Sequence, residues 1–159
     1  MFRDPLTESL VAFVRGVGIP VHPAALPAPT FLPGLAIRDG AILVDESRLT
    51  WPGDILHEAG HLAVAHPDER ARPQLAPTPG DEMATIAWSY AAARHLGLAP
   101  EVLFHAGGYK EGSSALIENF AQGRYIGVPL LHCYGMAVEP RQAAAGCSEP
   151  YPHMLRWLR

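Results

Sequence analysis

Residues 57–61 read His-Glu-Ala-Gly-His, and this five-residue string constrains the fold more than any other part of the chain. On an α-helix, side chains four positions apart lie on the same face, so His57 and His61 can direct two imidazoles at one point. Glu58 is turned by about 100° around the helix axis, which places its carboxylate beside that point. The string therefore predicts a helix with two ligands for one cation and an adjacent base.

Zinc is the ion that this residue pattern favours. Neutral imidazole nitrogens bind zinc at about 2.0–2.1 Å, and a catalytic zinc site keeps one position open for water. Zinc lowers the pKa of that water, and a nearby carboxylate can remove its proton. We therefore expect zinc as the cofactor and Glu58 as the general base. The alternative is that His57 and His61 are partly exposed helix residues that pair with Glu58 or Glu69.

Apolar residues at helical spacing alternate with prolines and glycines, which divides the chain into short elements. The Asp-Gly pair inside residues 35–45 lies between two apolar runs and predicts a β-hairpin. Helices are expected over 5–15 with Asp4 as N-cap, over 51–65 with Asp54 as an alternative N-cap, over 81–96 with Asp81 as N-cap, over 114–122, near Arg141 and over 153–159. The pattern indicates one α+β domain over residues 1–159, with a small antiparallel sheet.

The third metal ligand has three candidates. His66 lies nine residues after His57, which is about 900° around a helix and half a turn away from the metal face. Its better explanation is a histidine at a helix C-terminus, favoured by the macrodipole. Asp81 is explained as an N-cap. We prefer Glu82, which shares a helix face with Ile86 and Ser89 and can line the interface with the histidine helix; the other two stay open. Gly60 fits such an interface, because a glycine inside a helix needs a close-packing reason.

The segments HEAGHLAVAH and GDEMATIAWSYAAARHL, with the proline-rich spacer between them, resemble the zincin metallopeptidases of the ImmA/IrrE type. The similarity covers residues 35–97, and Ala84 stands where that family often has Asn. It implies a minimal, gluzincin-like metallopeptidase domain with an HExxH helix and a glutamate helix. It further implies His57, His61 and Glu82 as zinc ligands, Glu58 as general base, and a cytoplasmic peptidase activity.

The C-terminal third, residues 98–159, is rich in glycine and aromatic residues and lies outside that similarity. Zinc hydrolases commonly use a Tyr or His outside the ligand set to hydrogen-bond the developing oxyanion, and glycines let a loop approach a substrate. His105 and Tyr109 are the candidates for this catalytic role. The alternative is that these rings are core residues and that Gly107-Gly108 is a turn.

Composition limits the partners of the chain. Twelve Lys and Arg against sixteen Asp and Glu give a formal net charge of -4, so we expect no nucleic-acid binding. The longest apolar runs are far shorter than the roughly 20 residues that cross a bilayer, so we expect no membrane span. The N-terminus lacks a signal-peptide pattern, and two cysteines, Cys133 and Cys147, do not form a disulfide framework. We therefore expect a cytoplasmic protein.

Together these features predict a zinc-dependent hydrolase that cleaves a peptide or protein substrate. In the predicted reaction, Glu58 deprotonates a zinc-activated water that attacks a polarised carbonyl. The alternative function is a non-catalytic module that binds metal and acts in regulation or interaction. An intact Glu58 favours the enzyme, because a site without turnover does not need the base.

Overall fold

The computed structural model describes residues 1–27, 29–109, 112–143 and 148–159. In this part of the chain the α+β class is confirmed. The elements are α1 (Pro5–Val17), β1 (Val21–Pro23), β2 (Leu35–Arg38), β3 (Ala41–Val44), α2 (Asp54–Val64), α3 (Pro67–Arg70), α4 (Pro79–His95), α5 (Pro100–Leu103), α6 (Ser113–Ala121) and α7 (Val128–Cys133), followed by a 3₁₀ turn over Pro140–Gln142.

The three strands form one sheet in the order β1-β3-β2. β2 and β3 make the predicted hairpin, and Asp39 and Gly40 have the positive φ values of 49° and 73° that its tight turn requires. The expectation of an antiparallel sheet was wrong, because β1 pairs in parallel with β3 and the sheet is mixed. A parallel neighbour has no tight turn that the sequence can mark. Here a proline-rich connection leads from β1 to the opposite edge of the sheet.

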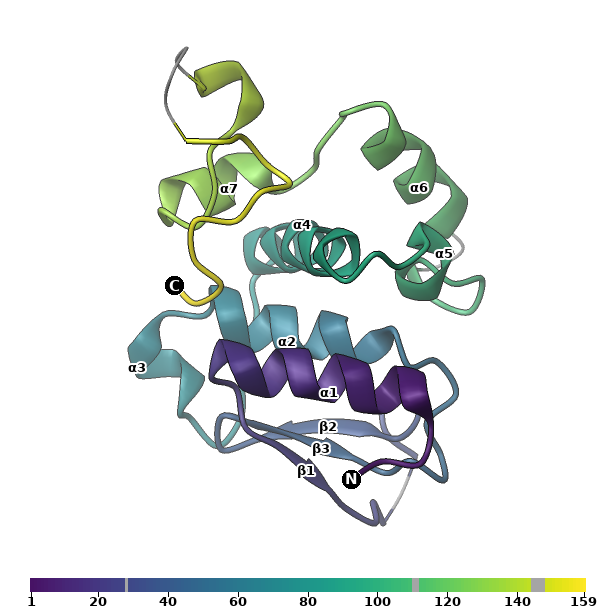
Figure 1. The fold of residues 1–159 in the computed structure, drawn as a ribbon. Coiled ribbons are helices and arrows are strands. Elements are labelled where there is room, and N and C mark those ends of the chain that lie inside the picture. The colour runs from purple at the N-terminus through teal and green to yellow at the C-terminus, as the bar shows by residue number, and fades with distance from the viewer. Residues whose placement is uncertain (28, 110–111, 144–147) are drawn as a thin grey trace.

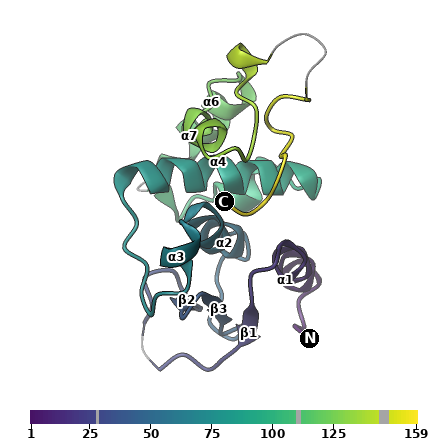
Figure 2. The same cartoon turned by 90° about the vertical axis from the view of Figure 1, so that its left-hand side faces the viewer.

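The elements stack in layers, with the sheet at the bottom of Figure 1, α1 and α2 above it, and α4 above α2. Figure 2 shows α4 lying across the molecule, with α2 on one side of it and α6 and α7 on the other. α2 packs most extensively against α4. The residues between these two helices are part of a hydrophobic core that also includes buried residues of α1, the sheet and the C-terminal elements.

Local signals define most helix ends. Asp4 caps α1 by accepting a hydrogen bond from the Thr7 amide, as expected, but the helix continues through Gly16 and ends at Gly18, which has φ 104°. α4 ends at His95, and Gly97, two residues later, has the left-handed backbone conformation that often follows a helix. Its N-cap is Thr78, which forms a capping box with Asp81, so the prediction of Asp81 as the N-cap was wrong by three positions.

Two predictions about α2 were also wrong. Asp54 does not cap this helix, since the N-cap is Gly53 and Asp54 is the buried first helical residue. A side chain at Gly53 would collide with the Val102 carbonyl, so only a glycine lets the α2 N-terminus approach α5 this closely. α2 ends at Val64, one residue early, because Ala65 is extended. His66 is therefore the N-cap of α3 and not a histidine at a helix C-terminus.

The C-terminal segment packs back onto the helices. The expected helix over 153–159 is absent from this described segment, which instead forms a β-bridge between Met154 and Ala137 and places the Trp157 ring against Trp88. The Arg159 amide donates to the Ala63 carbonyl at the end of α2. The predicted short helix near Arg141 is the 3₁₀ turn.

The structure describes one of the two cysteines. Cys133 is an exposed free thiol at the end of α7, whereas Cys147 lies outside the described residues. Among the helices of the described ranges, none combines the length and apolar character needed to cross a membrane.

Candidate metal centre

Gly60 brings the two helices of the site together. A Cβ atom at this position would lie 2.9 Å from Cγ2 of Thr85 and 3.0 Å from Oγ of Ser89, both buried residues of α4. The Ser89 hydroxyl also donates to the Leu56 carbonyl of α2. A glycine at position 60 therefore sets a short distance between α2 and α4, as the sequence indicated, and side chains one turn away can meet across the interface.

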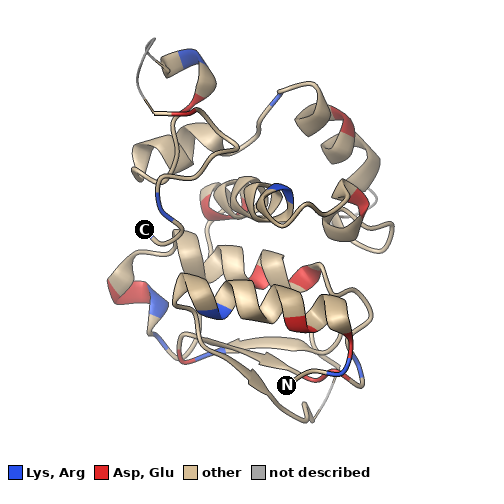
Figure 3. Cartoon of the chain, viewed as in Figure 1, with Lys and Arg blue, Asp and Glu red and all other residues tan. Residues whose placement is uncertain are grey.

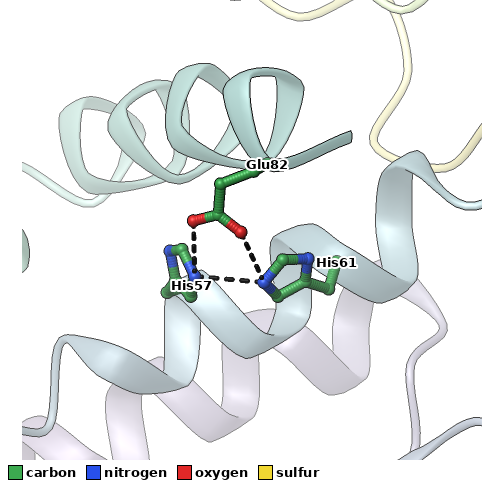
Figure 4. Close-up of side chains that lie close together, drawn as sticks. All are labelled: His57, His61 and Glu82. Carbon is green, nitrogen blue, oxygen red and sulfur yellow. Dashed lines mark hydrogen bonds and ion pairs between the residues drawn. The ribbon is translucent and has the colours of Figure 1, made fainter. Parts of the chain in front are cut away.

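Three side chains converge at this interface, two from α2 and one from α4 (Figure 4). Nε2 of His57 and Nε2 of His61 are 3.1 Å apart. Each lies 3.3 Å from a different carboxylate oxygen of Glu82. The three residues that sequence reasoning selected as ligands are thus the three that the fold brings together.

The spacing of these atoms fits a tetrahedral metal ion. Ligands that bind zinc at about 2.05 Å with tetrahedral geometry are about 3.3 Å from each other. The observed separations of 3.1 to 3.3 Å match this value. Two imidazoles and one carboxylate are also a donor set that zinc takes in catalytic sites, where the fourth position is left for water. These residues therefore fit a zinc ion.

The opposite nitrogen of each histidine also has a partner. The Nδ1 atom of His57 is 3.3 Å from the hydroxyl of Tyr109, and the Nδ1 atom of His61 is 3.3 Å from Oγ1 of Thr85. A hydroxyl that accepts a hydrogen bond from Nδ1–H keeps Nε2 free of a proton. Such outer partners orient metal-binding histidines and fix the tautomer that binds.

Burial keeps both imidazoles neutral. It lowers the pKa of His57 to about 3, and the neighbouring His61 contributes further. Burial also lowers the pKa of His61 to about 4, although the Asp81 carboxylate opposes this change. Neutral imidazole is the form that binds a metal ion. The two ligands are thus ready to bind at neutral pH without losing a proton.

The charge of the surrounding helices favours a cation. α2 carries Asp54 and Glu58 and no Lys or Arg, and Figure 3 shows acidic residues on both α2 and α4. The Glu82 side chain is 44% exposed, and burial of its other half raises its pKa. Negative charge on both sides of the centre therefore produces a field that attracts a positive ion.

Glu58 lies beside the three convergent residues and is not one of them. It lines the same hollow as both histidines and Glu82. Burial, together with the nearby carboxylates of Asp54 and Glu82, raises the pKa of its carboxyl group to about 7. Within the part of the chain that the structure describes, no hydrogen bond or ion pair engages this carboxylate. It is therefore free to exchange a proton near neutral pH.

The centre lies in a groove made of two adjoining hollows. The first has a volume of about 540 Å³ and is walled by apolar residues that include Ile37, Leu75 and Pro77. The second has a volume of about 400 Å³ and is lined by Leu32, Gly107, Gly108 and Tyr109 among others. His57, Glu82 and the fully exposed Phe31 line both hollows. The two hollows therefore meet at His57 and Glu82 of the centre.

Three other residues named from the sequence do not line these two hollows. His66 is exposed, and its Nδ1 accepts a hydrogen bond from the Asp68 amide. Asp81 holds the N-terminus of α4 through Thr78. His105 is buried, with Nε2 2.8 Å from Asp54, so the structure does not place its ring in the groove. Of the two proposed oxyanion donors, only Tyr109 lines a hollow beside the centre.

Sequence reasoning missed three contributors to the site. Thr85 lies three residues after Glu82 on α4 and contacts His61, and Asp54 lies three residues before His57 on α2. Helical spacing relative to the ligands is a signal that could have found both of them. Phe31 belongs to a proline-rich loop without regular structure, and no periodic pattern places its ring at the groove.

Comparison of the chain with protein-family models, with curated proteins and with solved structures finds no match. The geometry of the centre is therefore the basis for any statement of function.

Proposed function

We propose that the chain is a zinc-dependent hydrolase, and specifically a peptidase of the zincin type. The observation that carries this proposal is the triangle of His57, His61 and Glu82, whose donor atoms lie 3.1 to 3.3 Å apart and which line one hollow. A zinc ion held there would act as a Lewis acid that makes a water molecule acidic and polarises a carbonyl group. The remaining chemistry depends on the side chains around it.

Glu58 is the proposed general base. Its carboxylate lines the groove next to the ligands, and burial raises the pKa of its carboxyl group in the metal-free protein. A carboxylate in this place can accept a proton from the attacking water and then return it to the leaving amine. Glu58 therefore serves as base and then as acid in one turnover.

The shape of the groove supports a peptide substrate. A chain cleaved at the centre has residues on both sides of the reacting carbonyl, and two hollows of about 540 and 400 Å³ adjoin the centre. Their walls are largely apolar, with polar groups concentrated at the centre, as is typical of substrate sites. Tyr109 lines one hollow and remains the candidate hydrogen-bond donor to the oxyanion.

Elemental analysis followed by digestion of a peptide library tests the proposal. We expect about one zinc per chain, and cleavage by the wild-type protein that chelation abolishes. Glu58→Gln should retain zinc and lose cleavage. Zinc binding without any cleavage across a broad library would favour the non-catalytic metal-binding module, and a protein that binds no zinc would refute both functions.

A further inference from the structure

A buried hydrogen bond between Asp54 and His105 joins the start of α2 to the segment that follows α5. Oδ1 of Asp54 is 2.8 Å from Nε2 of His105, and the two side chains are 5% and 4% exposed. Among the described residues, Oδ2 of Asp54 and Nδ1 of His105 are buried without a hydrogen-bond partner. Each such atom costs about 1–3 kcal/mol, which offsets the net gain of about 0.5–1.5 kcal/mol from a typical hydrogen bond. Stability alone therefore does not explain this pair.

The His105 ring is held by contacts with Trp51 and Gly108. It stacks on the Trp51 ring with centroids 4.3 Å apart and an interplanar angle of 9°. A Cβ atom at Gly108 would lie 3.0 Å from Cε1 of His105, so the backbone there approaches the ring closely. The Ser113 hydroxyl donates to the His105 carbonyl at 2.6 Å. These contacts fix residues 105–108 in place.

Tyr109 follows this fixed turn and reaches the metal centre. Its backbone has a φ of 56°, which few non-glycine residues adopt, and its hydroxyl is 3.3 Å from Nδ1 of His57. Asp54 and His57 are three residues apart and lie on the same side of α2. The segment 105–109 thus contacts α2 at two points, through His105 on Asp54 and through Tyr109 on His57.

We propose that Asp54 and His105 are positioning residues of the metal centre, whose pair holds the segment 105–109 so that the Tyr109 hydroxyl accepts a hydrogen bond from Nδ1–H of His57. That hydrogen bond fixes the orientation of the imidazole and leaves Nε2 free to bind the ion. The inference rests on the zinc centre of the proposed function. Loss of such an outer partner typically weakens metal affinity by about 10-fold to 100-fold.

A double-mutant cycle on the complete protein tests this role. Zinc affinity is measured by chelator competition for wild type, Asp54→Asn, Tyr109→Phe and the double variant. We expect each single change to weaken affinity by about 10-fold or more, and the double variant to bind as Tyr109→Phe does, because Asp54 acts through Tyr109. Asp68→Asn, at an exposed aspartate of α3, is the matched control and should leave affinity unchanged. Losses that multiply in the double variant would overturn the inference.

A measurement without metal separates this inference from the proposed function. Imidazole ¹⁵N shifts of the metal-free protein should show His57 protonated on Nδ1, and Asp54→Asn should produce a mixture of tautomers. His105→Asn should give the same mixture, so it replaces Asp54→Asn if that variant does not fold. An unchanged tautomer in a folded variant refutes the positioning role. A wild-type protein with the expected tautomer but no affinity for zinc instead refutes the proposed function.

Discussion

Glu58→Gln separates the role of this residue in turnover from its effect on stability. Burial and, to a smaller extent, the carboxylates of Asp54 and Glu82 together raise the pKa of the Glu58 carboxyl group from 4.5 to about 7. The folded protein therefore binds this proton more tightly than the unfolded chain does. Between about pH 4.5 and pH 7 the folded protein keeps this proton while the unfolded chain has lost it. The free energy of unfolding therefore falls as the pH rises through this range.

The magnitude follows from the size of the pKa change. A displacement from 4.5 to about 7 corresponds to roughly 3 kcal/mol. Solvent in the groove screens part of this energy, so we expect about 2 kcal/mol. Glutamine is neutral at every pH, so metal-free Glu58→Gln should be more stable than metal-free wild type by about 2 kcal/mol at pH 8. At pH 4.5 the difference should be close to zero.

Urea unfolding of both proteins in the presence of a chelator, at pH 4.5 and pH 8, measures this difference. Glu101→Gln, at an exposed glutamate of α5, is the matched control and should change stability little at either pH. With zinc restored, Glu58→Gln should lose turnover by about 10²-fold to 10⁴-fold, as expected for a lost general base. A stability difference that does not depend on pH, or undiminished zinc-dependent cleavage, would refute the reasoning.

Three further predictions concern the ligands, the hydroxyl and the helix contact. His61→Ala and Glu82→Ala should each abolish tight zinc binding and the thermal stabilisation that zinc provides, whereas Asp81→Ala should retain zinc. Elemental analysis and melting curves with and without zinc test both expectations. Tyr109→Phe, assayed at saturating zinc, should lower kcat by about 10²-fold to 10³-fold if the hydroxyl donates to the oxyanion, and a normal kcat would restrict Tyr109 to positioning. Gly60→Ala should reduce the free energy of unfolding by about 1–3 kcal/mol through overpacking against α4, and it should also weaken zinc affinity. An unchanged free energy of unfolding and an unchanged zinc affinity, both measured by calorimetry, would contradict the packing argument.

The sequence was most informative where a structure depends on local chemistry. The hairpin was predictable because Asp39 and Gly40 tolerate the positive φ values of its turn, and α1 was predictable from Asp4 at its N-cap. The spacing of His57 and His61 likewise needs only a helix to bring two imidazoles together. Each of these features is decided within about five residues, so no knowledge of the rest of the fold was necessary.

Features that join distant segments could not be predicted in this way. The pair of Asp54 and His105 spans 51 residues, and no local pattern marks either partner. The parallel pairing of β1 with β3 depends on the route of an irregular loop. α4 is buried around most of its circumference, between α2 and the C-terminal elements, so it lacks a polar face that would show which side meets the histidines. Glu82 was therefore a preference from the sequence, and its position became evident only from the packing of α4.

The close contact at Gly60 has a consequence for the timing of activation. Packed side chains and backbone of α2 and α4 set the spacing between the two helices, and none of the atoms that approach Gly60 belongs to a candidate metal ligand. If the proposed zinc centre is correct, packing of this kind would hold the ligands close together before the ion binds, so we expect zinc binding without a folding step. Under the proposed function, loss of zinc would stop turnover and remove only the stability that zinc binding itself contributes, and resupply would restore turnover as fast as the ion can enter the groove.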